Sequence, residues 1–195
     1  MSRRPDRPAA YLWKKCPDPP EFWLREFPCT WICEWRFFSS FFVFKTGYDF
    51  DGLLCRDCRP DEDDDGPKYL NFIRTAEPLN VPRPQQIPLI ATARREAYRA
   101  ETLQWLARHG ASVDRLVMGQ WSSLRDRTAE KVVEMKAEAF RDDSRLTFFA
   151  ESDPWQAEEI ARLVPAKPVV CPPTGRIWNA DKLTEGDGDP NVKHR

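Results

Sequence analysis

The chain has 195 residues, of which 41% are hydrophobic and 31% are charged, and its formal net charge is −1. This length suits one α/β domain with a core, the composition is that of a globular protein, and the balanced charge disfavours nucleic acid or an anionic membrane as the main partner. No apolar stretch reaches the length of a membrane span, and no N-terminal run has the form of a signal peptide, so we expect a cytoplasmic protein.

The first 44 residues are expected to form an arm that precedes the main domain. Residues 1–20 are rich in proline and charge, whereas residues 21–44 are dense in phenylalanine and tryptophan, interrupted by charged residues. So many aromatic side chains need a surface to bury against. The segment is interpreted as a lid packed on the main domain or, alternatively, as the surface for a second subunit or a protein partner.

From residue 45 onward, short apolar runs alternate with amphipathic segments. The predicted strands are one ending in the run 48–52 and four more at residues 87–91, 114–118, 146–150 and 168–171. The predicted helices cover residues 67–76, 98–109, 125–140 and 154–164. This alternation predicts a parallel sheet of about five strands with helices on both faces. The domain is therefore expected over residues 45–179, followed by a loose polar tail at 180–195.

Polar residues follow several of these strands at the point where each strand ends. They are Asp49 and Asp51, Thr92, and Glu151 with Asp153. In a parallel α/β sheet, ligands bind beyond the carboxyl ends of the strands. Carboxylates gathered in a small cavity need a cation, and oxygen ligands suit Mg²⁺. A carboxylate can also attack phosphorus, while a second one transfers a proton, so this set predicts phosphoryl transfer.

Four segments, in order, resemble the motifs of the haloacid dehalogenase (HAD) superfamily. The run YDFDGLL at 48–54 resembles the DxDGxL signature, and IATAR at 90–94 resembles the second motif, an apolar strand that ends in Thr or Ser. Lys136 is similar to the third motif, and FFAESD at 148–153 resembles the fourth. The resemblance covers roughly residues 45–172 and implies a three-layer, Rossmann-like HAD fold. The gaps between the motifs are too short for a large cap domain, so a minimal cap is expected.

The resemblance also implies roles for individual residues. Asp49 would be the nucleophile and Asp51 the general acid and base, while Thr92 and Lys136 would bind the phosphoryl group. The implied protein is a Mg²⁺-dependent phosphohydrolase or phosphotransferase that forms an aspartyl-phosphate. Its substrate would be a phosphorylated small molecule, such as a nucleotide or a sugar phosphate.

The implied Mg²⁺ would be held by Asp49, by the backbone carbonyl of Asp51, and by either Glu151 or Asp153. Asp153 precedes Pro154, so helix capping explains it equally well. Glu151 directly follows the strand, and the choice between the two acids stays open.

The assignment of Lys136 to the third motif rests on the expected burial of its side chain. Lys136 shares the apolar stripe of its predicted helix with Val132 and Val133, which is unexpected for a lysine without an anionic partner. Lys131 is the alternative. The acidic run 61–65 is interpreted as a solvated loop in preference to a second metal site.

The six cysteines allow several interpretations. Cys29 and Cys33, together with Cys55 and Cys58, have paired spacings that a four-thiolate zinc site would use, but the two pairs lie far apart. Disulfide frameworks are typical of shorter secreted chains. We therefore expect reduced, mostly structural thiols.

Two departures from the HAD pattern support a second hypothesis. Lys45–Gly47 interrupts the apolar run before the first motif, and the fourth motif is Glu-x-Asp. The chain would then be a catalytically weak or inactive HAD-like module with an assembly or regulatory role through residues 21–44. It also resembles the HAD modules attached to phosphoribosyltransferases, with CPPTGR at 171–176 near the end, which implies an accessory to a separate phosphoribosyltransferase.

Overall fold

The computed structural model describes residues 9–13, 23–27, 36–39, 41–82, 86–123 and 126–179. By its contacts the chain divides into two units, Met1–Cys33 and Glu34–Arg195. The described part of the first unit is a parallel pair, β1 (Ala9–Trp13) and β2 (Trp23–Phe27). The division falls earlier than the predicted boundary at residue 45. The predicted tail at 180–195 lies outside the described residues.

The second unit is built on a mixed, mostly parallel sheet of six strands in the order β5-β4-β3-β6-β7-β8. The strands are β3 (Thr46–Tyr48), β4 (Gln86–Arg95), β5 (Ser112–Gly119), β6 (Phe148–Ala150), β7 (Val169–Cys171) and β8 (Arg176–Trp178). Only β8 runs antiparallel to its neighbour, β7. The predicted α/β class is confirmed, with β8 as an additional short strand that the sequence pattern did not indicate.

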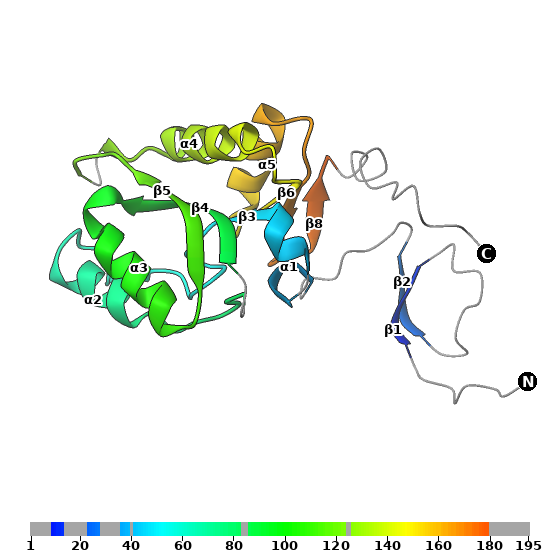
Figure 1. Ribbon diagram of the computed structural model, residues 1–195, viewed down its shortest axis with the longest axis horizontal. Coiled ribbons are helices and arrows are strands. Elements are labelled where there is room, and N and C mark those ends of the chain that lie inside the picture. The colour runs from blue at the N-terminus through cyan, green and yellow to red at the C-terminus, as the bar shows by residue number, and fades with distance from the viewer. Residues whose placement is uncertain are drawn as a thin grey trace, which may run out of the picture. The chain divides into compact units, whose positions relative to one another are not determined.

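Helices cover both faces of this sheet (Figure 1). They are α1 (Arg36–Ser39), α2 (Pro67–Thr75), α3 (Arg99–Arg108), α4 (Ala129–Asp142) and α5 (Pro154–Leu163), with short 3₁₀ turns η1 (Phe41–Lys45) and η2 (Glu96–Tyr98). In Figure 1, α4 and α5 lie together on one side of the sheet, and α2 and α3 lie on the other. A buried cluster joins α4 and α5 to the strands, and includes Leu89, Phe140, Phe149 and Ile160. No helix in the described ranges is long and apolar enough to cross a membrane.

Local signals set the ends of the helices. The Thr128 hydroxyl accepts a hydrogen bond from the backbone N–H of Lys131 at the start of α4, and the Asp153 carboxylate accepts one from Gln156 at the start of α5. Both are N-caps, and Pro154 occupies the first turn of α5, where its missing N–H costs nothing. Beyond the end of α3, Gly110 has a φ of +73°, which favours glycine.

The end of the aromatic run packs against the sheet. Phe37, Phe38 and Phe42 are buried, and the ring of Phe148 on β6 lies edge-on to Phe37 with the centroids 5.4 Å apart. The Tyr48 hydroxyl donates a hydrogen bond to the backbone carbonyl of Phe37. This part of the run therefore belongs to the core of the second unit.

The short β3 occupies the centre of the sheet. It lies between β4 and β6, and its residue Gly47 leaves no room for a side chain, because an added Cβ would come within 2.9 Å of the Phe149 ring and 3.1 Å of Leu89. The glycine within the interruption at Lys45–Gly47 thus has a packing reason. The chain goes from β3 to one side for β4 and β5, and later returns to the other side for β6 and β7. In sheets of this kind, that change of direction opens a crevice at the carboxyl ends of the central strands.

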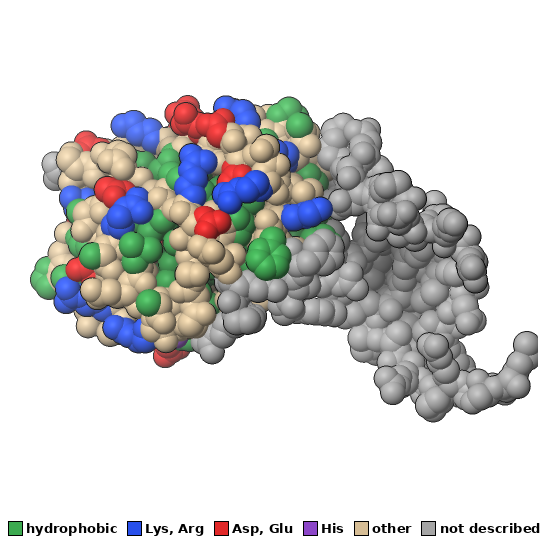
Figure 2. Space-filling model, viewed as in Figure 1, with side chains coloured by type: hydrophobic (Ala, Val, Ile, Leu, Met, Phe, Trp, Pro, Cys, Tyr) green, Lys and Arg blue, Asp and Glu red, His purple; other side chains and the backbone are tan. Residues whose placement is uncertain are grey.

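Figure 2 shows one face of the molecule, on which acidic, basic and apolar side chains are interspersed. No single sign of charge dominates the described part of this face, in keeping with the net charge of −1.

Candidate functional site

A cavity of about 440 Å³ lies at the carboxyl ends of the central strands. Its lining includes five of the six predicted site residues: Asp49, Asp51, Thr92, Lys136 and Asp153. The sixth, Glu151, is fully buried and contacts Lys136. The parallel register explains this convergence, because Tyr48 lies opposite both Ile90 and Ala150, so that the residues after β3, β4 and β6 meet at one edge.

Lys136 bridges three acceptors inside this site. Its ammonium nitrogen lies 3.0 Å from Asp49 Oδ1, 2.8 Å from Glu151 Oε2 and 3.0 Å from Gln156 Oε1. The Lys136 side chain is 1% exposed, as its place on the apolar stripe predicted. Lys131 is exposed instead and donates to the backbone carbonyl of Asp126.

Two carboxylates and one ammonium thus share a buried environment. Burial acts to lower the pKa of Lys136, but the charges of Asp49 and Glu151 outweigh it, and the pKa is raised. Burial and the neighbouring charge of Asp49 raise the pKa of Glu151, although Lys136 opposes that shift. The ammonium therefore stays charged and holds Asp49 in place.

Ser152, which is absent from the predicted site residues, lies at the centre of three oxygen acceptors. Its Oγ is 3.0 Å from Asp49 Oδ2, 2.9 Å from the backbone carbonyl of Asp51 and 3.4 Å from Glu151 Oε1. A hydroxyl has one proton, so it can satisfy only one of the three at a time. The only sequence signal for Ser152 is its place between two acids after a buried strand.

These three acceptors test whether the site fits Mg²⁺. In the described part of the chain, no three His, Cys, Asp or Glu side chains form a group that could hold a metal ion. Two carboxylate oxygens and one backbone carbonyl do converge, and oxygen-only donors of this kind suit a hard cation. The kind of donor is thus the one that Mg²⁺ prefers, but the three oxygens surround the Ser152 hydroxyl, and metal binding by Asp49, the carbonyl of Asp51 and Glu151 stays a prediction. Asp153 lines the cavity but uses Oδ1 as the cap of α5, so its part in metal binding stays a prediction.

Asp51 is held by a buried arginine that was not predicted. Arg94 Nη2 lies 2.6 Å from Asp51 Oδ1, and Arg94 Nε lies 3.2 Å from Oδ1 and 3.0 Å from Oδ2. Arg94 is part of the second motif-like run, where its backbone N–H donates to the hydroxyl of Thr92. A charged residue two positions after Thr92, just beyond an apolar run, was the available sequence signal.

The loop between β3 and α2 supplies another wall of the cavity. Asp57, Cys58 and Asp63 line it, and Asp63 Oδ2 lies 3.4 Å from the guanidinium of Arg127, which also lines the cavity. Burial, followed by the charges of Asp51 and Asp49, raises the pKa of Asp57. An excess of carboxylates around one cavity favours a cation among them.

The acidic run 61–65 has structural partners. Asp64 accepts hydrogen bonds from backbone N–H groups at the start of α2, Glu62 pairs with Arg56 at 2.7 Å, and Asp65 pairs with Arg95 at 2.6 Å. These contacts agree with the interpretation of the run as a loop.

Cys55, Cys58 and Cys171 are free thiols. Cys55 and Cys171 are buried, which suits the expected structural role. Cys29 and Cys33, the other half of the imagined zinc site, lie outside the described residues. His109 follows α3 with its ring 4.3 Å from that of Trp105, in keeping with a structural role.

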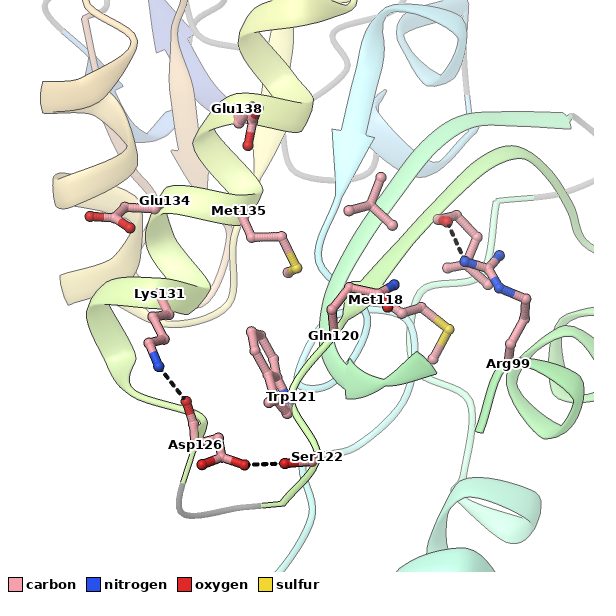
Figure 3. A pocket seen from close by; sticks show the side chains of 12 residues that line it. Arg99, Met118, Gln120, Trp121, Ser122, Asp126, Lys131, Glu134, Met135 and Glu138 are labelled. Carbon is pink, nitrogen blue, oxygen red and sulfur yellow. Dashed lines mark hydrogen bonds between the residues drawn. The ribbon is translucent and has the colours of Figure 1, made fainter. Parts of the chain in front are cut away.

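A larger cavity of about 760 Å³ lies between β5 and α4 (Figure 3). Trp121, Gln120, which follows β5, and Met135 of α4 all line this cavity, and the buried Nε1 of Trp121 makes no hydrogen bond to any residue that the structure describes. The cavity lies at the edge strand of the sheet and contains none of the predicted site residues.

No protein-family model, curated protein or solved structure matches this chain.

Proposed function

We propose that the protein is a Mg²⁺-dependent phosphohydrolase or phosphotransferase of HAD type that acts through an aspartyl-phosphate. The observation that carries this proposal is the contact between Asp49, directly after the central strand, and the buried ammonium of Lys136 at the wall of one cavity. A nucleophilic carboxylate needs a neighbouring cation to bring a phosphate dianion close to it. The resemblance of the four segments to the HAD motifs supports the same assignment.

The reaction would run in two steps that share one pair of aspartates. A carboxylate oxygen of Asp49 attacks phosphorus, the ester P–O bond breaks, and the Asp51 carboxyl gives its proton to the departing oxygen. Asp51 then takes a proton from water, whose oxygen attacks phosphorus. The bond to Asp49 breaks, which releases orthophosphate and restores both groups. In a phosphotransferase, an acceptor alcohol would replace the water.

The remaining side chains would bind and orient the phosphoryl group. Lys136 and the hydroxyl of Thr92 both line the cavity and can hold its oxygens. Mg²⁺, held by Asp49, the carbonyl of Asp51 and an acid of the fourth motif, would supply neutralisation of the phosphate charge. A cavity of about 440 Å³ is in the range of small-molecule sites, so a nucleotide or a sugar phosphate is a suitable substrate class.

One observation favours the second candidate function, a HAD-like module without turnover. Both carboxylate oxygens of Asp49 already have partners within the protein, Lys136 and Ser152. A network of ion pairs and hydrogen bonds of this kind can also have a purely structural role. The chain would then act in assembly or regulation through its aromatic N-terminal segment.

A phosphate-release assay distinguishes the proposed enzyme from the module without turnover. We would measure phosphate release with p-nitrophenyl phosphate and with a panel of nucleotides and sugar phosphates, with Mg²⁺ or with EDTA. The expected result is activity that needs Mg²⁺ and falls to background in Asp49→Asn. Asp114→Asn is the matched control, because Asp114 lies near the amino end of β5, where it pairs with Arg145 at 3.2 Å. A folded protein that is silent on every substrate would favour the module without turnover.

A further inference from the structure

The candidate cavity has two basic side chains in its described lining, Lys136 and Arg127. The ammonium of Lys136 belongs to the phosphoryl-binding end of the proposed function and is already shared among three acceptors, Asp49, Glu151 and Gln156. Carboxylates outnumber basic groups along this lining, so an anionic group of a substrate can bind only beside a cation. Arg127 is therefore the basic group that the cavity leaves available to the rest of a substrate.

Arg127 is held only loosely by its acidic neighbour. Its Nη2 lies 3.4 Å from Asp63 Oδ2, at the far end of the hydrogen-bond range, and its side chain is 29% exposed. The guanidinium makes no other hydrogen bond to the part of the chain that the structure describes. A guanidinium carries five N–H donors, so most of those of Arg127 are free to meet a ligand.

Other ion pairs of the same acidic loop are tighter. Arg95 Nη1 lies 2.6 Å from Asp65 Oδ1, and Arg56 contacts both oxygens of Glu62 at 2.7 Å. Neither of these arginines lines the cavity. The loose contact thus occurs where the loop meets the arginine of the cavity wall.

The backbone on each side of the loose pair is well anchored. Thr128, the residue after Arg127, caps α4 through the N–H of Lys131. Asp64, the residue after Asp63, accepts hydrogen bonds from two backbone N–H groups at the start of α2. The fold therefore places Arg127 at the cavity wall but leaves its donors largely unused.

Arg127 and Lys136 come from different levels of the same helix region. α4 begins at Ala129, and at the usual rise per residue it climbs roughly 10 Å from there to Lys136. Arg127 precedes Ala129 by two positions. This backbone separation favours a contact of Arg127 with the body of the substrate, away from the phosphoryl group beside Lys136.

The chemistry of the pair favours an anion over a neutral, hydroxyl-rich group. A hydroxyl-rich substrate would need Asp63 as its acceptor, but Asp63 Oδ1 is buried, with no hydrogen-bond partner among the described residues, and Oδ2 faces Arg127. The fork of an arginine matches a carboxylate or a phosphate through two parallel N–H···O bonds. An exposed ion pair of this kind contributes little, so an anionic ligand can compete with Asp63 for the guanidinium.

We propose that Arg127 is a specificity-determining residue, which binds a second anionic group, a carboxylate or a phosphate, on the part of the substrate that is not transferred. This inference rests on the proposed function and narrows its substrate class. Within that class, the site selects phosphate esters that carry two anionic groups over sugar phosphates that carry one.

The test measures binding without turnover. Straight-chain phosphonocarboxylates with two to five methylene groups cannot be hydrolysed, and the series covers a range of distances between the two anionic groups. We would titrate them, and the amides of the same acids, into the full-length protein with Mg²⁺ present, by isothermal calorimetry. The best acid should bind about 10-fold more tightly than its amide, as expected for hydrogen bonds to a charged group. Bisphosphonates of the same lengths show whether carboxylate or phosphate is preferred.

The variants assign this preference to the guanidinium. Arg127→Gln should bind acid and amide equally, and Arg127→Lys should recover part of the preference, because it keeps the charge without the fork. The control is Lys131→Gln, which removes one positive charge near the start of α4 from a side chain outside this cavity, and the preference should persist. Asp63→Asn removes the competing charge and should raise the affinity for the acid alone. This last variant tests the inference even if Arg127→Gln does not fold.

The outcomes separate the inference from the function on which it rests. Equal affinity for acid and amide at every chain length, or a preference that persists in Arg127→Gln, would overturn the inference, and phosphate release from other esters would stand. A folded protein that prefers the acid through Arg127 but releases no phosphate from the corresponding phosphate esters would overturn the proposed function and keep the binding site. A protein that binds no phosphonate and releases no phosphate would overturn both.

Discussion

Lys136 decides the electrostatics of the candidate site at the scale of single residues. One buried ammonium contacts two carboxylates, Asp49 and Glu151, and the amide oxygen of Gln156. Removing one member of a buried charge group costs far more than the group contributes as a whole, because it leaves unpaired charge in a poorly solvated place. The stability of the domain and the geometry of Asp49 therefore depend on the same side chain.

We expect Lys136→Met to lower the free energy of unfolding by about 3–5 kcal/mol, measured by urea denaturation. The control is Lys131→Met on the same helix, where the lysine is exposed, with an expected change within about 0.5 kcal/mol. Lys136→Met combined with Glu151→Gln should recover part of the loss, since one of the two unpaired charges is gone. If the loss of unfolding free energy in the double variant equalled the sum of the losses in Lys136→Met and in Glu151→Gln alone, the ion-pair explanation would be wrong.

At the scale of elements, the turn between β6 and α5 serves structure and site together. Glu151 is buried against Lys136, Ser152 reaches Asp49, and Asp153 caps the helix through the N–H of Gln156 at 2.8 Å. Three consecutive residues thus have three different contacts. The cap leaves one oxygen of Asp153 for another role, so the two roles can be separated by substitution.

Asp153→Ser should keep the free energy of unfolding within about 0.5 kcal/mol, because serine is an equally good N-cap, whereas Asp153→Ala should lower it by about 1 kcal/mol. Both variants lose the carboxylate. If Asp153 holds Mg²⁺, the Mg²⁺ concentration that gives half-maximal phosphate release should rise in both. If Glu151 is the ligand instead, that concentration should stay the same in Asp153→Ser.

At the scale of the whole molecule, the chain consists of two units divided after Cys33. The sheet, the helices on both faces and the candidate site all lie in the second unit. Residues at the end of the aromatic run, such as Phe37 and Phe42, pack in its core. The aromatic segment is therefore divided between the two units, and the partner interpretation of the segment stays a prediction.

A protein that begins at Glu34 should unfold cooperatively, with a melting temperature within about 4 °C of the full chain, as measured by circular dichroism. Its phosphate release should be retained if the site works by itself. Light scattering with size-exclusion chromatography tests the assembly role, since a complex that needs residues 1–33 dissociates in the shorter protein. A shorter protein that fails to fold would contradict the division into two units.

Much of the fold was predictable because periodicity is a local property. The alternation of strands and helices, the caps at Asp153 and Gly110, and the burial of Lys136 each follow from residues within a few turns of one another. The strand-end residues were predictable as a group, because parallel strands share one carboxyl edge. Phosphoryl-transfer chemistry could be proposed for these residues from their shared place at the strand ends.

The tertiary structure decided the contacts that join distant parts of the chain. Arg94 meets Asp51 across two neighbouring strands, Ser152 reaches the carbonyl of Asp51 from β6, and the short β8 exists only through its pairing with β7. Such contacts depend on strand order and register, which are set by the packing of the whole core and not by any one segment. The sequence by itself determined which residues stand at the carboxyl ends of the strands. The order of those strands decided which atoms face one another, because a hydrogen bond requires an exact placement that local patterns do not encode.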